Sequence, residues 1–243
     1  MNIKLKDLID KSDILLEVLD SRFPKACRIK YIERYIKEKK KHLILVLNKS
    51  DLVPEDFIEI VMEEFSNEYP TVYVSSKTRK GSRRLRKIIK EMGKDMEKAY
   101  IGVFGYPNTG KSSVINLVVG RKRAKTSPIP GFTRGLQIIK LSKKFYLIDS
   151  PGIVIPRNKY LLAILGAIRV EKIEFPQKAV LYLYKHIGKK PFEEAYNIKV
   201  DNLKDLFIKL KEKYNVKDKD WIKKVARIIL YDWQRGKIKG FWL

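Results

Sequence analysis

The order of two short motifs constrains this chain more than any other feature. Residues 105–112 read GYPNTGKS and match the G-x-x-x-x-G-K-[ST] pattern of a phosphate-binding loop. Residues 48–51 read NKSD and match the N-K-x-D pattern that reads guanine. In ordinary domains that carry both motifs the phosphate loop comes first, whereas here it comes second. The order predicts a familiar nucleotide-binding domain whose chain has been cut and rejoined at new points.

Short apolar runs alternate with amphipathic stretches over residues 1–155. The runs predicted as strands are 13–19, 43–47, 71–74, 100–104, 136–141 and 145–148. The stretches predicted as helices are 28–40, 55–68 and 82–97. This alternation predicts an α/β fold with a parallel sheet between helices, and its last two strands are close enough to pair antiparallel. Each motif follows a strand, at the edge of the sheet where ligands bind.

Helical spacing takes over after Pro156, which predicts a smaller, all-helical domain over residues 156–243. We expect one helix from Pro176 to near Gly188, a second that Asp201 caps and that runs to about Tyr214, and a last one that Asp218 or Asp220 caps and Gly236 ends. The predicted apolar face of the last helix is Trp221, Ile222, Val225, Ala226, Ile229 and Trp233. The residues predicted to lie away from it are Lys223, Lys224, Arg227 and Arg235.

The charge of the chain predicts a polyanionic partner. Lys and Arg number 53 against 28 Asp and Glu, a formal net charge of +25. A lysine-rich surface of a heat-adapted protein is the alternative, but such enrichment raises Glu together with Lys. Residues 99–146 contain no carboxylate, so the charge is clustered, and nucleic acid is the favoured partner.

Other features of the sequence indicate the cellular location of the chain. No run approaches the roughly 20 apolar residues of a membrane span, and the stretch 161–168 is predicted to be a buried helix. The first residues show no signal-peptide pattern. Cys27 is the only cysteine, which excludes an internal disulfide and suits the cytoplasm. We expect a monomer that does not enter membranes.

The phosphate loop lies between a predicted strand and a helical run, 112–119, as its chemistry requires. Its glycines let backbone N–H groups surround phosphates, and Lys111 reaches the β- and γ-phosphates. The hydroxyl of Ser112 is the expected Mg²⁺ ligand. Asp149, which begins the sequence DSPG after an apolar strand, is placed to complete the Mg²⁺ shell, and the N–H of Gly152 to sense the γ-phosphate. In the loop 127–134, Thr133 is the candidate that contacts both Mg²⁺ and the γ-phosphate.

Guanine recognition rests on two loops. The carboxylate of Asp51 can accept from both N1–H and the N2 amine of guanine, and adenine would leave it unpaired. Ser75, Ser76 and Lys77 would add a backbone N–H near guanine O6. The predicted nucleotide-binding residues are Asn48, Lys49, Asp51, Ser75, Ser76, Lys77, Asn108, Thr109, Gly110, Lys111, Ser112, Ser113, Thr133, Asp149 and Gly152. Lys111 and Thr133 are the predicted catalytic residues.

The full motif order resembles the circularly permuted GTPases of the YlqF/YawG family. The order is N-K-x-D, S-S-K, G-x-P-N-x-G-K-S, P-G-x-T-R and D-x-P-G, or G4-G5-G1-G2-G3. Further similar segments are 20–24 (DSRFP), 162–168 and 231–238, so the resemblance covers most of the chain. It implies a P-loop GTPase fold, GTP or GDP with Mg²⁺, and a helical domain that contacts ribosomal RNA during assembly of the large ribosomal subunit. It also implies that Asn108 binds a stimulating K⁺.

The histidine considered catalytic in bacterial members has no counterpart here: His42 and His186 receive no catalytic role.

The motifs predict slow hydrolysis by the chain alone. The place after D-x-x-G where a water-positioning Gln usually stands holds Ile153, so a ribosomal subunit or K⁺ is expected to complete the site. Two other interpretations of the function remain open. One is an RNA-binding module whose guanine nucleotide is structural and not hydrolysed, and the other is a GTPase of tRNA modification.

Overall fold

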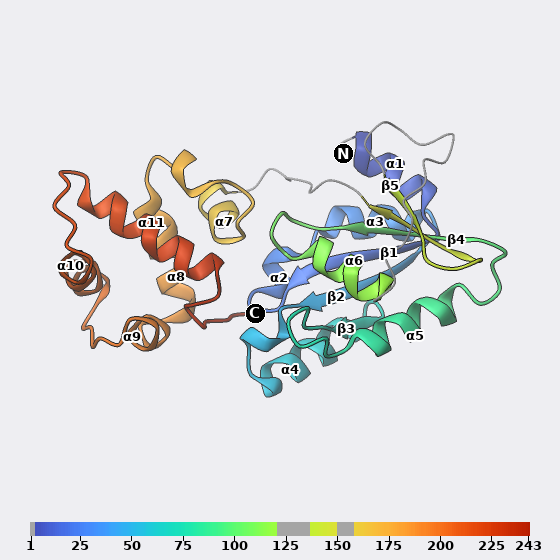
Figure 1. Ribbon diagram of the computed structural model, residues 1–243, viewed down its shortest axis with the longest axis horizontal. Coiled ribbons are helices and arrows are strands. Elements are labelled where there is room, and N and C mark those ends of the chain that lie inside the picture. Colours follow the sequence, from blue (N-terminus) through green and yellow to red (C-terminus); the bar gives the residue numbers. More distant parts are fainter. Residues whose placement is uncertain (1–2, 121–136, 150–157) are drawn as a thin grey trace. The chain divides into compact units, whose positions relative to one another are not determined.

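The computed structural model describes residues 3–120, 137–149 and 158–243, and of Gln137 and Asp149 only the backbone (Figure 1). The chain divides into two compact units. We call residues 1–154 the N-terminal unit and residues 155–242 the helical unit. Each is described separately.

A six-stranded sheet organises the N-terminal unit. Its strands lie in the order β3 (Thr71–Tyr73), β2 (His42–Asn48), β1 (Ile14–Asp20), β4 (Ala99–Phe104), β6 (Phe145–Asp149) and β5 (Gln137–Lys140). All neighbours pair in parallel except β5 and β6, which are antiparallel. The strands predicted from the sequence are thus confirmed, and so is the antiparallel pairing of the last two.

Helices cover both faces of this sheet, which explains why every residue of β1 is buried. On one face, Leu16 and Val18 belong to a core that includes Leu85 of α5 (Ser82–Met92) and Val114 of α6 (Lys111–Val119). On the other side, α1 (Ile3–Lys11) packs on β4 and α3 (Lys30–Glu38) on β2, while α4 (Glu55–Ser66) packs on β3. The predicted helices in this unit are confirmed, with α5 ending earlier than expected at Gly93.

Helix α1 was not expected from the sequence, although it has a clear structural role. Leu5, Leu8 and Ile9 are buried on its inner side. The Ser12 hydroxyl, just after the helix, donates to the Leu8 carbonyl at 2.7 Å. A Cβ on Gly102 would lie 2.3 Å from the Ser12 Oγ, so this glycine of β4 lets the end of α1 approach the sheet.

The described part of the helical unit contains α7 (Lys159–Ile164), α8 (Pro176–Ile187), α9 (Lys190–Tyr196), α10 (Leu203–Lys213) and α11 (Trp221–Gln234). Helix α11 packs on α7, α8 and α10. Its Trp233 is fully buried and donates from Nε1 to the Ile164 carbonyl at 3.1 Å. The helix predicted from Pro176 to Gly188 is confirmed, and so is burial in the stretch that begins at 161.

Three sequence expectations in this unit were wrong. Helix α10 is capped by Asn202, whose Oδ1 accepts from the Asp205 N–H at 3.1 Å, and not by Asp201. Ile222 was placed on the inner face of α11, but its side chain is 42% exposed. Arg227 was placed on the outer face, but it is half-buried and its Nε is inaccessible to solvent. Helix α11 packs on several helices, so it buries a wider part of its circumference than the spacing of its apolar residues indicates.

Candidate functional site

The phosphate loop lies between β4 and α6, as its motif requires. Gly105 and Gly110 have φ angles of 144° and 92°, values that favour glycine, and Asn108 also has a positive φ of 61°. A Cβ on Gly105 would lie 2.5 Å from the Val18 carbonyl oxygen of β1. The loop therefore needs glycine here both for its turn and for its approach to the neighbouring strand.

Polar groups in the loop point to a phosphate site at the start of α6. Lys111 is buried and donates from Nζ to the Tyr106 carbonyl at 2.7 Å, and Thr109 Oγ1 donates to the same carbonyl at 2.9 Å. Ser112 and Ser113, in the first turn of α6, are exposed. Backbone N–H groups at the beginning of a helix favour anions, so the loop can cradle phosphates there while Lys111 adds a positive charge.

The sheet register brings the acidic motif to the same place. Asp149 ends β6 and pairs with Val103 of β4, two residues before the phosphate loop begins. Carboxylate and hydroxyl oxygens are the hard donors that Mg²⁺ prefers, so the residue types Asp149 and Ser112 suit this metal. The residues present thus fit the metal of a bound nucleotide. Among the described residues there is no cluster of three or more His, Cys, Asp and Glu side chains suited to a metal.

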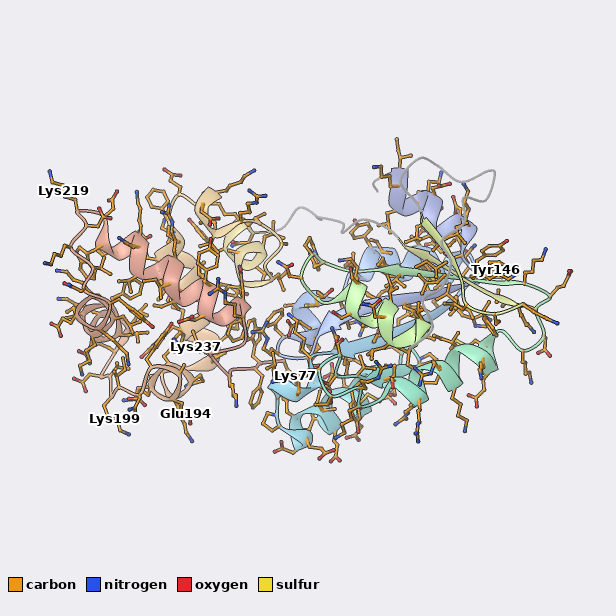
Figure 2. The ribbon with its side chains drawn as sticks, viewed as in Figure 1. Lys77, Tyr146, Glu194, Lys199, Lys219 and Lys237 are labelled. Carbon is orange, nitrogen blue, oxygen red and sulfur yellow. The ribbon has the colours of Figure 1, made fainter. Side chains whose placement is uncertain are left out.

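The guanine-reading motif begins at the end of β2. Asp51 is exposed, and its Oδ1 accepts from the Ser75 hydroxyl at 2.6 Å. Ser75 Oγ also accepts the N–H of Thr78 at 3.1 Å, so the loop after β3 holds the Asp51 carboxylate in place. Lys77, labelled in Figure 2, is an exposed residue of this loop. The two loops predicted to bind guanine are therefore hydrogen-bonded to each other.

Asn48 connects the guanine-reading motif with the phosphate loop. Its Nδ2 donates to the Thr109 carbonyl at 2.9 Å, and its Oδ1 accepts from the Ser76 hydroxyl at 2.9 Å. A Cβ on Gly110 would lie only 2.1 Å from the Asn48 Nδ2. Motifs separated by about sixty positions thus form one site, although their order along the chain is reversed.

A buried ion pair beneath the site was not assigned a role from the sequence. Arg22 donates to both oxygens of Asp20 at 3.0 and 2.9 Å, and both side chains are 2% exposed. Lys49 of the guanine-reading motif donates from Nζ to Asp20 Oδ2 at 2.7 Å. Burial alone would raise the pKa of Asp20, but Arg22 and then Lys49 lower it to about 2. Asp20 therefore remains a carboxylate and positions Lys49.

The sequence did contain a signal for this pair. The segment 20–24 was noted because it resembles a family motif, yet its chemistry is apparent only from its contacts. By contrast, the predicted residues Thr133, Gly152 and Ile153 lie outside the described part of the chain, as does the loop 127–134. The side chain of Asp149 lies outside it too. His42 begins β2, at the opposite end of that strand from Asn48, and His186 stacks on Tyr182 in α8 of the helical unit.

Comparisons with known protein families identify two matching profiles. The profile described as RsgA GTPase matches residues 10–157, more than half of the chain. The profile described as 50S ribosome-binding GTPase matches residues 100–220. The first of these spans both the guanine-reading motif and the phosphate loop, and the second extends into the helical unit.

Individual relatives agree with these profiles. A GTP-binding protein of Methanocaldococcus jannaschii is 37% identical over 96% of this chain and 65% of its own length. Nucleolar GTP-binding protein 2 of Pneumocystis carinii is 34% identical over 98% of this chain and 52% of its own length. The chain thus spans about half to two thirds of these relatives.

Solved structures share the fold. The GDP-bound structure of YlqF from T. maritima superimposes with a TM-score of 0.69, at 22% identity, over 97% of this chain and 96% of that chain. The GNP-bound structure of the same protein gives a TM-score of 0.68 over 96% and 92%. The predicted fold class is thereby confirmed, including the permuted order of its motifs.

Proposed function

The chain belongs to the family of circularly permuted GTPases described by the RsgA profile, and we propose that it binds and hydrolyses GTP as an assembly factor of the large ribosomal subunit. The observation that carries this proposal is the Asn48 bridge, which joins a guanine-reading loop to a phosphate loop in one site. The name of the second matching profile, 50S ribosome-binding GTPase, supports the choice of partner.

In this proposal each residue has a separate task. Asp51, held by Ser75, accepts the N1 and N2 protons of guanine. Lys111 leaves the Tyr106 carbonyl and neutralises the β- and γ-phosphates, while Ser112 and Asp149 hold Mg²⁺. Bound Mg²⁺ neutralises the charge that develops on the phosphate oxygens. Thr133 and Gly152 contact the γ-phosphate, and Asn108 holds a stimulating K⁺.

The helical unit is the proposed RNA-binding part. In its described part every Lys and Arg is at least partly exposed, and Figure 2 shows the labelled Lys199 and Lys219 extending outward from it. The segment 150–157 links the acidic motif to this unit, so the state of the nucleotide can be transmitted through a few residues. We propose a monomer that holds rRNA with GTP bound and releases it after hydrolysis.

The proposed location is the cytoplasm, where large subunits mature in a cell without a nucleus. The nucleolar GTP-binding proteins among the relatives make the nucleolus the alternative in a nucleated host. In the described part of the chain, none of the helices has the length and apolar character to cross a membrane.

Turnover measurements test the proposed activity. GTP hydrolysis is measured for the chain alone and with purified large subunits, in K⁺ and in Na⁺ at equal ionic strength. We expect slow turnover alone, acceleration by subunits, faster turnover in K⁺, and loss of the K⁺ response in Asn108→Ala. A tightly bound GTP that stays intact with subunits present would instead favour an RNA-binding module whose guanine nucleotide is structural. An unchanged K⁺ response in Asn108→Ala would remove the asparagine as a ligand.

A further inference from the structure

The helical unit contains an apolar groove of about 400 Å³ between α8, α10 and α11. Its apolar lining includes Leu181, Phe207, Ile208, Trp221 and Ile222. Three of these side chains are well exposed: Leu181 at 40%, Ile208 at 38% and Ile222 at 42%. Single exposed apolar residues are ordinary, but here three from different helices meet around one hollow, and such patches mark interaction sites.

These three residues are not required by the core of the unit. Helix α8 is anchored by Ala179, Val180 and Leu183, which are all buried. Helix α10 is anchored by Leu206, Phe207 and Leu210, and α11 by a buried row that ends at Trp233. The exposed Leu181, Ile208 and Ile222 are thus additional to the residues that hold these helices together.

The charged residues that line the groove have one sign. Lys178 and Lys204 line it, and its lining includes no Asp or Glu. Within the described part of the chain neither lysine forms an ion pair, although other lysines of the unit do, such as Lys209 with Asp205 at 2.9 Å. Lys211 lies over the Trp221 ring at 5.0 Å and adds a third positive charge beside the floor.

We propose that this groove binds an amphipathic helix of a partner protein whose apolar face is flanked by carboxylates. Apolar residues at helical spacing would fill the floor, and the carboxylates would meet Lys178 and Lys204. A second copy of this surface would place lysines against lysines, in a chain whose net charge is +25. RNA would supply phosphates for the lysines but no apolar side chains for the floor. The helical unit would therefore hold a protein partner besides the RNA of the proposed function.

The test uses the full chain and a pair of synthetic peptides. One is an amphipathic helix of about 16 residues with Leu at positions i, i+3, i+4 and i+7 and Glu beside them, and its twin has Lys in place of each Glu. Binding is followed by tryptophan fluorescence and by amide NMR shifts in α8, α10 and α11. We expect the Glu peptide to bind at least about 10-fold more tightly than its twin.

Surface variants then assign the binding to the groove. Leu181→Ser and Ile208→Ser should each weaken the Glu peptide several-fold, whereas Ile60→Ser, at a residue 54% exposed on α4, should not. Lys178→Gln with Lys204→Gln should reduce the preference for Glu over Lys, and the exposed control pair Lys172→Gln with Lys199→Gln should not. The lysine variants alter only exposed side chains, so they remain informative if an apolar variant fails to fold.

Four results would overturn the proposal. They are equal affinity for the two peptides, insensitivity to Leu181→Ser and Ile208→Ser together, displacement of the peptide by an RNA oligonucleotide, and self-association that Ile208→Ser abolishes. None of these experiments uses GTP, so the proposal and the GTPase function can fail separately.

Discussion

In the N-terminal unit charged side chains lie in the interior beside the nucleotide motifs, whereas in the described part of the helical unit every charged side chain is at least partly exposed. Asp20 and Arg22 are 2% exposed and hold Lys49, and Asn48 is buried between two loops. The helical unit instead packs apolar residues around Trp233. The first unit thus has charged groups in its interior, whereas the charged groups of the second are on its surface.

This difference determines what substitutions do. Changes in the polar interior of the N-terminal unit should affect nucleotide binding and stability together, because a buried group left without its partner costs about 1–3 kcal/mol or more. Changes on the surface of the helical unit should affect partner binding alone.

Gly110→Ala should abolish nucleotide binding. The new Cβ would lie 2.1 Å from Asn48 Nδ2, at a backbone φ of 92°. Strain and a lost hydrogen bond together correspond to roughly 1,000-fold in affinity. The measurement is titration with a fluorescent GDP analogue. Gly120→Ala is the matched control, since its φ is 79° but no described residue lies within 4 Å of the added Cβ. Equal losses in both variants would mean that backbone strain alone, and not the Asn48 contact, is responsible.

Asp51→Asn should weaken GTP binding by about 100-fold and favour xanthine nucleotides. The amide cannot accept the two guanine protons, but it can donate to the O2 of xanthine. Competition titrations with GTP, XTP and ATP measure the change, and Asp56→Asn, at an exposed carboxylate on α4, is the control. If the unmodified chain binds ATP and GTP equally well, the assignment of Asp51 is wrong.

Asp20→Asn should lower the free energy of unfolding by an amount on the order of 2 kcal/mol and weaken nucleotide binding through Lys49. Because the pKa of Asp20 falls from 3.8 to about 2 on folding, its contribution is present above pH 3.8. It is lost as the pH falls toward 2. Denaturant unfolding is measured over this pH range. The free energy of unfolding should fall with acid in the unmodified chain and should fall less in the variant.

Glu55→Gln is the matched control for this prediction, because the Glu55–Lys80 pair lies at 2.7 Å but is exposed at 68% and 51%. An exposed pair contributes little to stability, because solvent and salt screen it. If the two substitutions lower the free energy of unfolding equally, burial of the Asp20 network does not explain the loss in Asp20→Asn.

Changing Lys223, Lys224 and Arg235 together to Gln should weaken binding to large subunits and flatten its salt dependence. Each lost phosphate contact removes about one unit of salt slope, while GTP affinity stays unchanged. Arg235 replaces Arg227 in this set because the Arg227 Nε is inaccessible to solvent, whereas Arg235 is exposed. The control removes the same charge from exposed positions on or beside α3, with Arg34, Lys37 and Lys39 changed to Gln. An unaltered salt slope would place the RNA surface elsewhere.

Glu17→Gln should stabilise the fold at neutral pH, because the neutral amide replaces a buried group that ionises in the unfolded chain. Glu17 is fully buried in β1, and its Oε1 accepts the Ile29 N–H at 2.8 Å. Burial, followed by the neighbouring Glu33 carboxylate, raises the pKa of Glu17 well above its ordinary value. The folded chain therefore binds a proton that the unfolded chain releases, and stability falls as the pH rises above 4.5. Unfolding curves at pH 5 and 7 should converge in the variant. A lower free energy of unfolding for the variant than for the unmodified chain at pH 7 would contradict this expectation.

The sequence predicted those features that follow from periodicity and from motifs. Apolar runs such as 43–47 predicted the strands, and the motif order predicted a permuted nucleotide-binding domain, but the contact of Asn48 with the phosphate loop is apparent only in the structure. Helix α1 was missed because its first turns mix lysines with apolar residues. The Asp20–Arg22–Lys49 network could not be derived from the sequence, since a short polar segment after a strand is ordinarily a solvated turn. The apolar groove depends on three helices meeting, which no single helical period shows.

Nucleotide-dependent binding to the large ribosomal subunit is the central claim, and co-sedimentation tests it most directly. The full chain is pelleted with purified large subunits in the presence of GDP or of a non-hydrolysable GTP analogue. We predict that the chain pellets with subunits in the analogue-bound state and stays largely in the supernatant with GDP. Equal pelleting in both states, or none in either, would contradict the account.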